Sequence, residues 1–274
     1  MLQFEVDSEL CTVCGQCASD CPPGIIDLKT GRPSIAPDRE QDCLRCEHCM
    51  AICPTGALSI LGVRPEELQP LPERFPDLKA LETLIRGRRS VRKFEDENLD
   101  PELLAHLLEV AWQAPTGHNA RQVQFTVVDD REKMAEIREK VLSGIGRLVQ
   151  ENALPQKLSY YAGISRMWEE RKVDMIFRGA PHLLIATAPA KLVTPMADCL
   201  IALTTFELFA QAHGVGTLWV AIATWAFDLL LPEMKQELGI PADHLFGYAM
   251  IFGKPAASYA RTVLHRNPII HRVR

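Results

Sequence analysis

Eight of the nine cysteines stand in two copies of one pattern, and they are the clearest candidates for chemistry in the chain. Each copy reads Cys-x2-Cys-x2-Cys-x3-Cys-Pro, and every cysteine and the proline recur 32 residues later. Such self-similarity at a fixed offset indicates an internal duplication. The cysteines of the first copy are Cys11, Cys14, Cys17 and Cys21, and those of the second are Cys43, Cys46, Cys49 and Cys53.

This spacing is typical of segments that bind two [4Fe–4S] clusters. The three closely spaced thiolates can surround one cluster, whereas the fourth lies beyond the turn and faces the other cluster. The pattern therefore predicts two crossed ligand sets, and about sixty residues with a small core would also need the clusters to stay folded. One cluster takes Cys11, Cys14, Cys17 and Cys53, and the other takes Cys43, Cys46, Cys49 and Cys21.

Structural zinc and a disulfide framework are the two alternatives to iron–sulfur clusters for these cysteines. Structural zinc also uses Cys-x2-Cys pairs, but it takes two separated pairs and not a triplet with a distant fourth ligand. A disulfide framework would need an oxidising compartment, and the N-terminus lacks the basic start and apolar run of a secretory signal. The ninth cysteine, Cys199, lies in a long apolar stretch and is expected to be a small buried hydrophobe.

Residues 5–62 resemble the bacterial-type two-cluster ferredoxins, and the resemblance rests on the duplicated cysteine pattern. It implies low-potential one-electron transfer. The spacing alone does not give that potential, because such clusters span several hundred millivolts.

The formal charge of the chain is concentrated at its N-terminal end. Residues 1–62 contain 9 acidic and 4 basic side chains, a net charge of −5, which equals the net charge of the whole chain. This distribution argues against nucleic acid as a partner. It suits docking with a protein that presents a basic face.

The composition predicts a soluble, cytoplasmic protein. Hydrophobic residues make up 47% of the 274 residues and charged residues 24%, as in ordinary globular domains. No apolar run approaches the length of about eighteen residues that indicates a membrane helix. The longest candidate, residues 200–220, is broken by Glu207, Gln211 and His213. We therefore expect no membrane association.

Pro65, Pro70, Pro72 and Pro76 predict a semi-rigid linker. The expected organisation is a ferredoxin domain over residues 1–62, a linker over 63–78 and a second domain over 79–274. Helices are expected over residues 77–87, 100–111 and 196–213, and strands over 124–129, 182–187, 217–223 and 246–253. Interleaved helices and strands predict an α+β fold with a central sheet flanked by helices.

A basic segment, Arg88-Arg89-Ser90-Val91-Arg92, lies between the first two of these helices. Its three guanidinium groups and its hydroxyl can bind a phosphate, because arginine presents forked donors that match phosphate oxygens. Taken alone, the segment is more simply explained as an exposed basic loop at a helix end.

Four motifs, in this order and at these separations, resemble the FMN-dependent nitroreductase family over residues 79–262. They lie at residues 88–92, 114–119, 214–219 and 253–255. The resemblance implies an α+β sandwich and a homodimer with FMN in a cleft shared between the subunits.

The resemblance also implies which residues bind FMN. The phosphate and ribityl chain would be held by Arg88, Arg89, Ser90 and Arg92, with Arg261 as a late contact to the phosphate. From the second subunit, the flavin would be approached by Pro115, Thr116 and Asn119. The backbone of Ala221 and Ile222 would lie near the reactive edge of the flavin.

Two stretches depart from the family pattern. The family usually has a glutamine two residues after Asn119, followed by Pro-Trp, whereas this chain has Ala120-Arg121-Gln122-Val123. Arg121 either steers an anionic substrate or the flavin edge, or is a surface residue. Ala221 and Ile222 replace paired glycines, so the cleft would be tighter. His118 is a candidate proton relay, although a loop histidine is more often simply hydrogen-bonded.

The aromatic residues of segment 143–178 have two candidate roles. The family places substrate-covering helices here, and the same side chains could instead form the core of a dimer interface. The residues in question are Tyr160, Tyr161, Trp168 and Phe177.

The two halves together predict an iron–sulfur flavoprotein oxidoreductase. The segment from Gly214 to Trp219 lacks the third glycine of a dinucleotide-binding loop, although nitroreductase-like proteins bind nicotinamide without it. A low-potential donor protein such as a ferredoxin would reduce the clusters, and FMN would reduce a small organic acceptor of nitro, quinone or conjugated carbonyl type. Two alternatives stay open: a flavin-linked dehydrogenase that exports electrons through the clusters, and a non-enzymatic electron relay or redox sensor.

Overall fold

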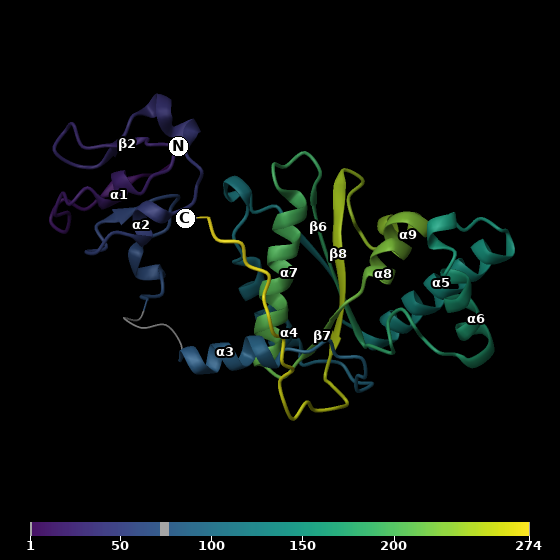
Figure 1. Cartoon of the computed structure of the whole chain (residues 1–274). Coiled ribbons are helices and arrows are strands. Elements are labelled where there is room, and N and C mark those ends of the chain that lie inside the picture. Colours follow the sequence, from purple (N-terminus) through teal and green to yellow (C-terminus); the bar gives the residue numbers. More distant parts are fainter. Residues whose placement is uncertain (1, 72–76, 274) are drawn as a thin grey trace. The chain divides into compact units, whose positions relative to one another are not determined.

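A computed structural model describes residues 2–71 and 77–273 (Figure 1). The described residues form two compact units. One lies within Met1–Phe75 together with His118–Ala120, and the other within Pro76–Gly117 together with Arg121–Arg274. Pro72 and Pro76 of the expected linker lie outside the described residues.

The first unit contains two antiparallel strand pairs and two short helices. Strand β1 (Glu5–Val6) pairs with β4 (Leu58–Ser59), and β2 (Ile26–Asp27) pairs with β3 (Ser34–Ile35). The third cysteine of each copy lies in a helix. The helices are α1 (Gln16–Ser19) and α2 (His48–Ala51), and the 3-10 turns are η1 (Pro37–Asp42) and η2 (Pro65–Glu67).

The internal duplication is visible in the backbone of this unit. Helix α2 follows α1, and strand β4 follows β2, at the same offset of 32 residues. Left-handed conformations recur at that offset, with φ of 54° at Val13 and 52° at Arg45, and of 60° at Gly24 and 65° at Gly56. A non-glycine residue adopts this conformation only where its surroundings fix it. The two cysteine loops are therefore built alike.

The second unit is a four-stranded antiparallel sheet with helices on both faces. Its strands are β5 (Gln124–Val128), β6 (His182–Pro189), β7 (Gly216–Trp219) and β8 (His244–Gly253), in the order β5-β6-β8-β7. Its helices are α3 (Leu78–Gly87), α4 (Pro101–Trp112), α5 (Arg131–Gln150), α6 (Tyr161–Arg171), α7 (Pro195–Ala212), α8 (Ala221–Trp225) and α9 (Glu233–Glu237). Shorter turns are η4 (Gln156–Leu158) and the π-helical η5 (Ala226–Leu230).

Strand β6 is buried on both faces because successive side chains of a strand point to opposite sides. Leu184 and Ala186 belong to a core that includes residues of α4 and α7. Leu183 and Ile185 belong to a second core that includes residues of α5, α6 and α8. Figure 1 shows α7 alongside β6 and β8, with which it is in contact. The expected α+β fold with a central sheet flanked by helices is confirmed.

Aspartate caps begin three helices of this unit. Asp77, Asp100 and Asp130 each accept a hydrogen bond from the backbone N–H three residues later, at 2.9, 3.3 and 2.8 Å. Pro101 occupies the first position of α4, where a missing N–H costs nothing. The helices expected from Asp77 and Asp100 are confirmed, whereas α5, which begins after Asp130, goes beyond the prediction.

The prediction of a strand over residues 217–223 is wrong in its second half. Pairing with β8 ends at Trp219, opposite Met250, and α8 begins at Ala221. The Thr224 hydroxyl donates to the Val220 carbonyl at 3.1 Å and accepts the Ala249 N–H at 2.9 Å. These two bonds fix a helical turn at the end of the strand. The sequence did not distinguish the two because an apolar run can be buried equally well in a strand or in a helix.

Helix α7 is apolar along most of its length. Cys199 is fully buried in it, as expected, and burial beside the Asp198 carboxylate raises the pKa of its thiol to about 12. Two carboxylates of the helix are also buried, since Asp198 is 2% and Glu207 5% exposed. Across the described ranges, no helix combines the length and the apolar character needed to span a membrane.

Candidate cofactor sites

The eight cysteines of the duplicated pattern line two separate cavities in the first unit. We call them the first cysteine set and the second cysteine set. Each set takes three cysteines from one copy and the fourth from the other copy, in the crossed arrangement that the spacing predicts. The first set is Cys11, Cys14, Cys17 and Cys53, and the second is Cys21, Cys43, Cys46 and Cys49. That these thiols bind iron stays a prediction.

The lining of both cavities fits a [4Fe–4S] cluster better than a single zinc ion. Structural zinc holds four thiolates about 2.3 Å from a single point. Here the four thiols of each set border a cavity instead, as they must when each sulfur binds a different corner of a cubane. Among the described residues, no group of three or more His, Cys, Asp or Glu side chains converges as it would around one ion.

Burial disfavours free thiolates in both sets. It raises the pKa of Cys49 to about 12 and also raises the pKa of Cys17, although neighbouring backbone amides act in the opposite direction. Iron binding must therefore displace protons from these thiols. At Cys53, burial raises the pKa, but hydrogen bonds from Ala57 and Thr55 outweigh burial and bring the pKa below its usual value.

The basic segment, residues 88–92, is fixed to both the sheet and α7. Ser90 forms a parallel bridge with Thr217 of β7, and the Val91 N–H donates to the Thr217 carbonyl at 2.9 Å. The Arg88 guanidinium binds the buried Glu207 carboxylate at 3.0 Å. The Thr217 hydroxyl donates to the same carboxylate at 3.4 Å.

The three arginines of this segment differ in the donors that they leave free. Arg88 is held by Glu207. Arg89 donates to the Arg86 carbonyl through Nη2 at 3.0 Å, but its buried Nε has no hydrogen-bond partner among the described residues. Arg92 is exposed, and its contact to the Ser90 carbonyl is long, at 3.4 Å. A buried donor without a partner is costly, so the surroundings of Arg89 and Arg92 fit an anionic group such as a phosphate.

Arg261 lies in the exposed segment that follows β8. Two residues earlier, the Tyr259 hydroxyl donates to the Ser90 carbonyl at 3.3 Å. The structure therefore brings the segment that carries Arg261 to the basic segment, while the Arg261 side chain itself is exposed.

A buried carboxylate holds the loop that follows α4. Asp198 of α7 accepts the Gly117 N–H at 3.0 Å and the Thr194 hydroxyl at 2.9 Å. A Cβ atom on residue 117 would lie 2.0 Å from the Thr194 hydroxyl oxygen, so the loop needs glycine here. Thr116 accepts the Arg121 N–H at 3.0 Å.

The backbone is strained directly after this point, in the turn η3 (Gly117–Asn119) and beyond it. His118, Asn119 and Arg121 have φ of 53°, 52° and 48°. Such conformations in non-glycine residues cluster at functional sites, where the surrounding structure fixes them. Among the residues expected to contact flavin here, Pro115 is exposed, and Thr116 and Asn119 are half-buried.

Two polar residues of this loop have different surroundings. His118, the candidate proton relay, is exposed. Within the first unit, the Asn119 side-chain amide donates to the backbone carbonyls of Leu44 and Arg45 at 3.1 and 2.9 Å.

Arg121 has contacts with α4. Its guanidinium carbon lies 4.5 Å from the centroid of the Trp112 ring, and Nη2 donates to Gln113 Oε1 at 3.4 Å. Stacking on an aromatic face leaves the edge of a guanidinium available to an anion. The position is compatible both with steering an anionic substrate and with an ordinary surface arginine.

Ala221 and Ile222 are the first residues of α8, directly after β7. The Ile222 carbonyl accepts the hydroxyl of Tyr161, and burial raises the pKa of Tyr161 far above its usual value. Tyr161 and Phe177 are both fully buried within the unit. For these two residues, both expected roles, covering the substrate and forming a dimer interface, are therefore wrong.

Two carboxylates that fix the expected cofactor loops were not among the predicted site residues. Asp198 and Glu207 are the charged residues of an otherwise apolar helix. Because a buried charge needs a partner, that contrast was a usable signal. It indicates that each carboxylate has a partner elsewhere in the chain, but it does not identify Arg88 or Gly117 as that partner.

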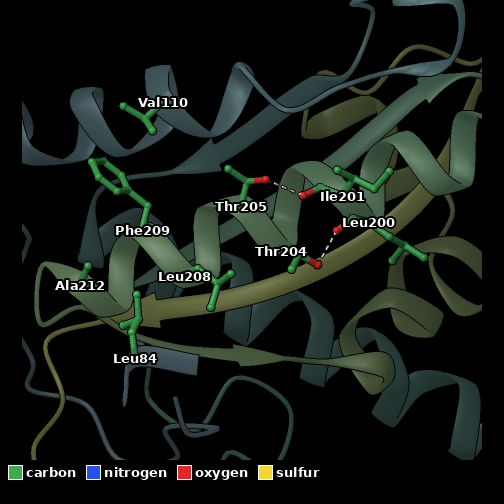
Figure 2. A pocket seen from close by; sticks show the side chains of 9 residues that line it. All are labelled: Leu84, Val110, Leu200, Ile201, Thr204, Thr205, Leu208, Phe209 and Ala212. Atoms are coloured by element: carbon green, nitrogen blue, oxygen red, sulfur yellow. Dashed lines mark hydrogen bonds between the residues drawn. The ribbon is translucent and has the colours of Figure 1, made fainter. Parts of the chain in front are cut away.

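A second face of α7 borders an apolar hollow of about 480 Å³ (Figure 2). The hydroxyls of Thr204 and Thr205 donate to the Leu200 and Ile201 carbonyls of the same helix, at 2.8 and 2.9 Å, so these threonines add no free donor to the hollow. The lining residues are Leu84, Val110, Leu200, Ile201, Thr204, Thr205, Leu208, Phe209 and Ala212.

Comparison with known families assigns both parts of the chain. Residues 85–254 match the model of the nitroreductase family. The chain belongs to the nitroreductase family. Residues 10–58 match the model of the 4Fe-4S dicluster domain. The predicted fusion of a ferredoxin-type domain with a nitroreductase domain is thus confirmed, and the protein is an oxidoreductase.

Individual relatives agree with this assignment. The 4-nitrobenzoate reductase of Nocardioides sp. is 32% identical over an alignment of 242 residues, which covers 76% of this chain and 95% of that protein. Nitroreductase NfnB of Mycolicibacterium smegmatis is 26% identical over 202 residues, covering 62% of this chain and 83% of that protein. A solved nitroreductase from Desulfitobacterium hafniense with bound FMN is 26% identical, with a TM-score of 0.55 over 70% of this chain and 97% of that chain.

The crossed cysteine sets make a prediction about paired substitutions. Cys14 and Cys53 belong to the same set, so Cys14→Ala with Cys53→Ala should remove one cluster, about four of about eight iron atoms. Cys14→Ala with Cys21→Ala should remove both clusters, because the two residues belong to different sets. Iron and acid-labile sulfide are measured on anaerobically purified protein. The opposite ranking of the two double variants would show that each copy binds its own cluster.

Proposed function

We propose that this protein is an iron–sulfur flavoprotein reductase in which electrons pass from a low-potential donor through two [4Fe–4S] clusters to FMN and on to a small organic acceptor. The supporting observation is the pairing, in one chain, of two four-cysteine cavities with a nitroreductase domain. In this proposal the ferredoxin-type domain comprises residues 1–62, the linker 63–78 and the nitroreductase domain 79–274.

The clusters would supply one-electron transfer, and FMN would accept electrons singly and deliver them in pairs. Each cysteine set would hold one cluster. Arg89 and Arg92 have the free donors for the FMN phosphate, and Glu207 orients Arg88 beside them. The remaining residues proposed to contact FMN are Ser90, Pro115, Thr116, Asn119, Ala221, Ile222 and Arg261.

The acceptor that we propose is a nitroaromatic compound. This choice is supported by the 32% identity to a 4-nitrobenzoate reductase over nearly the whole of that protein. Arg121, which stacks on Trp112, would add a cation that suits an acceptor with a carboxylate. Quinones and conjugated carbonyl compounds are the other acceptor classes to be tested, and His118 is the candidate proton donor.

The protein should act as a homodimer. A helix that is apolar all round is normally buried, and α7 packs one face on the sheet while another borders the apolar hollow. A second copy is the natural occupant of this hollow, because a twofold interface pairs one surface with itself. An FMN site that takes residues from two subunits would also require it.

Substitution in the hollow tests the dimer. Ile201→Glu places an unpaired charge in the proposed interface and should convert the protein to a monomer. Leu229→Glu is the matched control, because Leu229 is an exposed apolar residue outside the hollow. Sedimentation velocity gives the oligomeric state. A monomeric wild-type protein, or a dimeric Ile201→Glu protein, would contradict this interface.

The donor that we propose is a low-potential redox protein with a basic face, such as a ferredoxin, in the cytoplasm. Glu5, Asp7 and Glu9 are exposed and directly precede Cys11, which belongs to the first cysteine set. Their charge would attract such a donor to the ferredoxin-type domain. Added salt should slow the reaction, since exposed charges are screened within about 10 Å at 0.1 M salt.

Loss of the clusters tests the electron route. The double variant Cys14→Ala with Cys21→Ala should lose acceptor reduction driven by reduced ferredoxin, because both clusters would be absent. It should retain acceptor reduction driven by a small artificial donor such as reduced methyl viologen, which can reach the flavin directly. Anaerobic turnover with a nitroaromatic acceptor measures both. Full activity of the variant with ferredoxin would refute the route.

The basic segment makes the prediction about FMN. Arg89→Ala and Arg92→Ala should each weaken FMN binding roughly tenfold to a hundredfold, because a charge-assisted hydrogen bond contributes about 1.5–3 kcal/mol. Arg86→Ala is the control, since this exposed arginine pairs with Glu82 one turn earlier on α3. Flavin fluorescence during titration of the apoprotein gives the affinities. Unchanged affinity in both variants, or release of riboflavin or FAD from the native protein, would rule out this site.

A further inference from the structure

The two copies of the cysteine motif differ directly after their fourth cysteine. The first copy continues Cys21-Pro22-Pro23-Gly24, and the second continues Cys53-Pro54-Thr55-Gly56. Pro23 has neither an amide hydrogen nor a hydroxyl, whereas Thr55 has both. The duplication has therefore kept the cysteines and changed a hydrogen-bond donor beside one of them.

This difference reaches the sulfur atoms. The Sγ atom of Cys53 accepts the Ala57 N–H at 3.3 Å and lies 3.7 Å from the Thr55 hydroxyl oxygen. A thiolate that binds iron has no proton to donate, so the Thr55 hydroxyl must then be the donor. At Cys21, the residue in the place of Thr55 is a proline that cannot donate.

The second set also has a hydrogen bond to sulfur, from the Arg45 N–H to Cys43 at 3.3 Å. Backbone amides also act on one cysteine of each set, Cys17 and Cys49, and so do not distinguish the sets. The side-chain donor at Cys53 has no counterpart at Cys21. Solvent exposure acts in the same direction, because Cys14 is exposed and its counterpart Cys46 is half-buried. Hydrogen bonds to sulfur and exposure to water both stabilise the extra negative charge of a reduced cluster.

Side-chain charge does not reverse this ranking. Arg45 and Glu47 stand in the second copy where the first has Val13 and Gly15. Glu47 borders the second cavity and Arg45 does not, so the nearer of the two charges is negative and would oppose an added electron there. The hydroxyl donor at Thr55 and the carboxylate of Glu47 therefore act in the same direction.

We infer that the cluster held by the first cysteine set has the higher reduction potential of the two, and that Thr55 helps to set the difference. The inference rests on the proposed function only in that both sets hold [4Fe–4S] clusters. The step concerned is the uptake of one electron by a cluster from an external reductant, which is oxidised by one electron. A single electron shared by the clusters would therefore reside mainly in the first set.

A redox titration of the full-length holoprotein, reduced with dithionite and followed by electron paramagnetic resonance, tests this inference. The wild-type protein should show two separate one-electron cluster steps. In Thr55→Val, the step at higher potential should move down and the other should stay. At a fixed potential, the ratio of reduced to oxidised first cluster should fall roughly twofold to tenfold, the effect of one hydrogen bond.

Two further variants keep the result interpretable. Thr12→Val is the control, because Thr12 also borders the first cavity and should leave both steps in place. Pro23→Thr should supply a donor to Cys21 and raise the lower step. A single step for both clusters in the wild-type protein, or a Thr55→Val titration identical to that of Thr12→Val, would overturn the inference.

Failure of the proposed function would look different. Two steps that shift as expected, without any reduction of an acceptor by reduced ferredoxin, would leave the inference intact and refute the reductase. Iron and sulfide well below about eight atoms each per chain would refute both, because two clusters are required.

Discussion

The pairing of each cysteine triplet with the fourth cysteine of the other copy is the constraint on which the first unit depends. Each cavity joins a triplet from one copy with the fourth cysteine of the other, so neither copy can complete its site alone. The strands of this unit are two residues long, and its core is small. With clusters bound, eight metal–sulfur bonds would supply the cohesion that so small a core cannot. The left-handed residues Val13 and Arg45 follow from the same demand, because each loop must wrap around a cavity.

Helix α7 has the corresponding role in the nitroreductase domain. Its buried carboxylates hold two separate loops, with Glu207 bound to Arg88 and Asp198 bound to the Gly117 amide. Another face of the same helix borders the apolar hollow in which we place the second subunit. Buried charges are tolerated only with partners, so these carboxylates tie the position of both loops to one rigid element. A disturbance of the dimer interface should therefore also reach the proposed FMN site.

Features with a local cause could be predicted from the sequence. The cysteine motif that indicates [4Fe–4S] clusters occupies only eleven residues in each copy. The helix caps at Asp77 and Asp100 act within one helical turn. Features that depend on distant partners could not. The hydrogen bond between Arg88 and Glu207 joins residues 119 positions apart in the sequence, and the one between Gly117 and Asp198 joins residues 81 positions apart. The apolar side chains after Trp219 can be buried equally well in a strand or in a helix. The helix forms here because Thr224 makes hydrogen bonds to Val220 and Ala249.

In the proposed route, electrons enter through the ferredoxin-type domain and reach the flavin within the same protein. Stopped-flow absorbance under anaerobic conditions tests it most directly, with the oxidised full-length protein mixed in turn with reduced ferredoxin, NADH and NADPH. We expect reduced ferredoxin to bleach the cluster absorbance first and the flavin absorbance afterwards, faster than either nicotinamide. Rapid reduction of the flavin by NADH or NADPH, with the clusters following, would show instead that electrons leave through the ferredoxin-type domain.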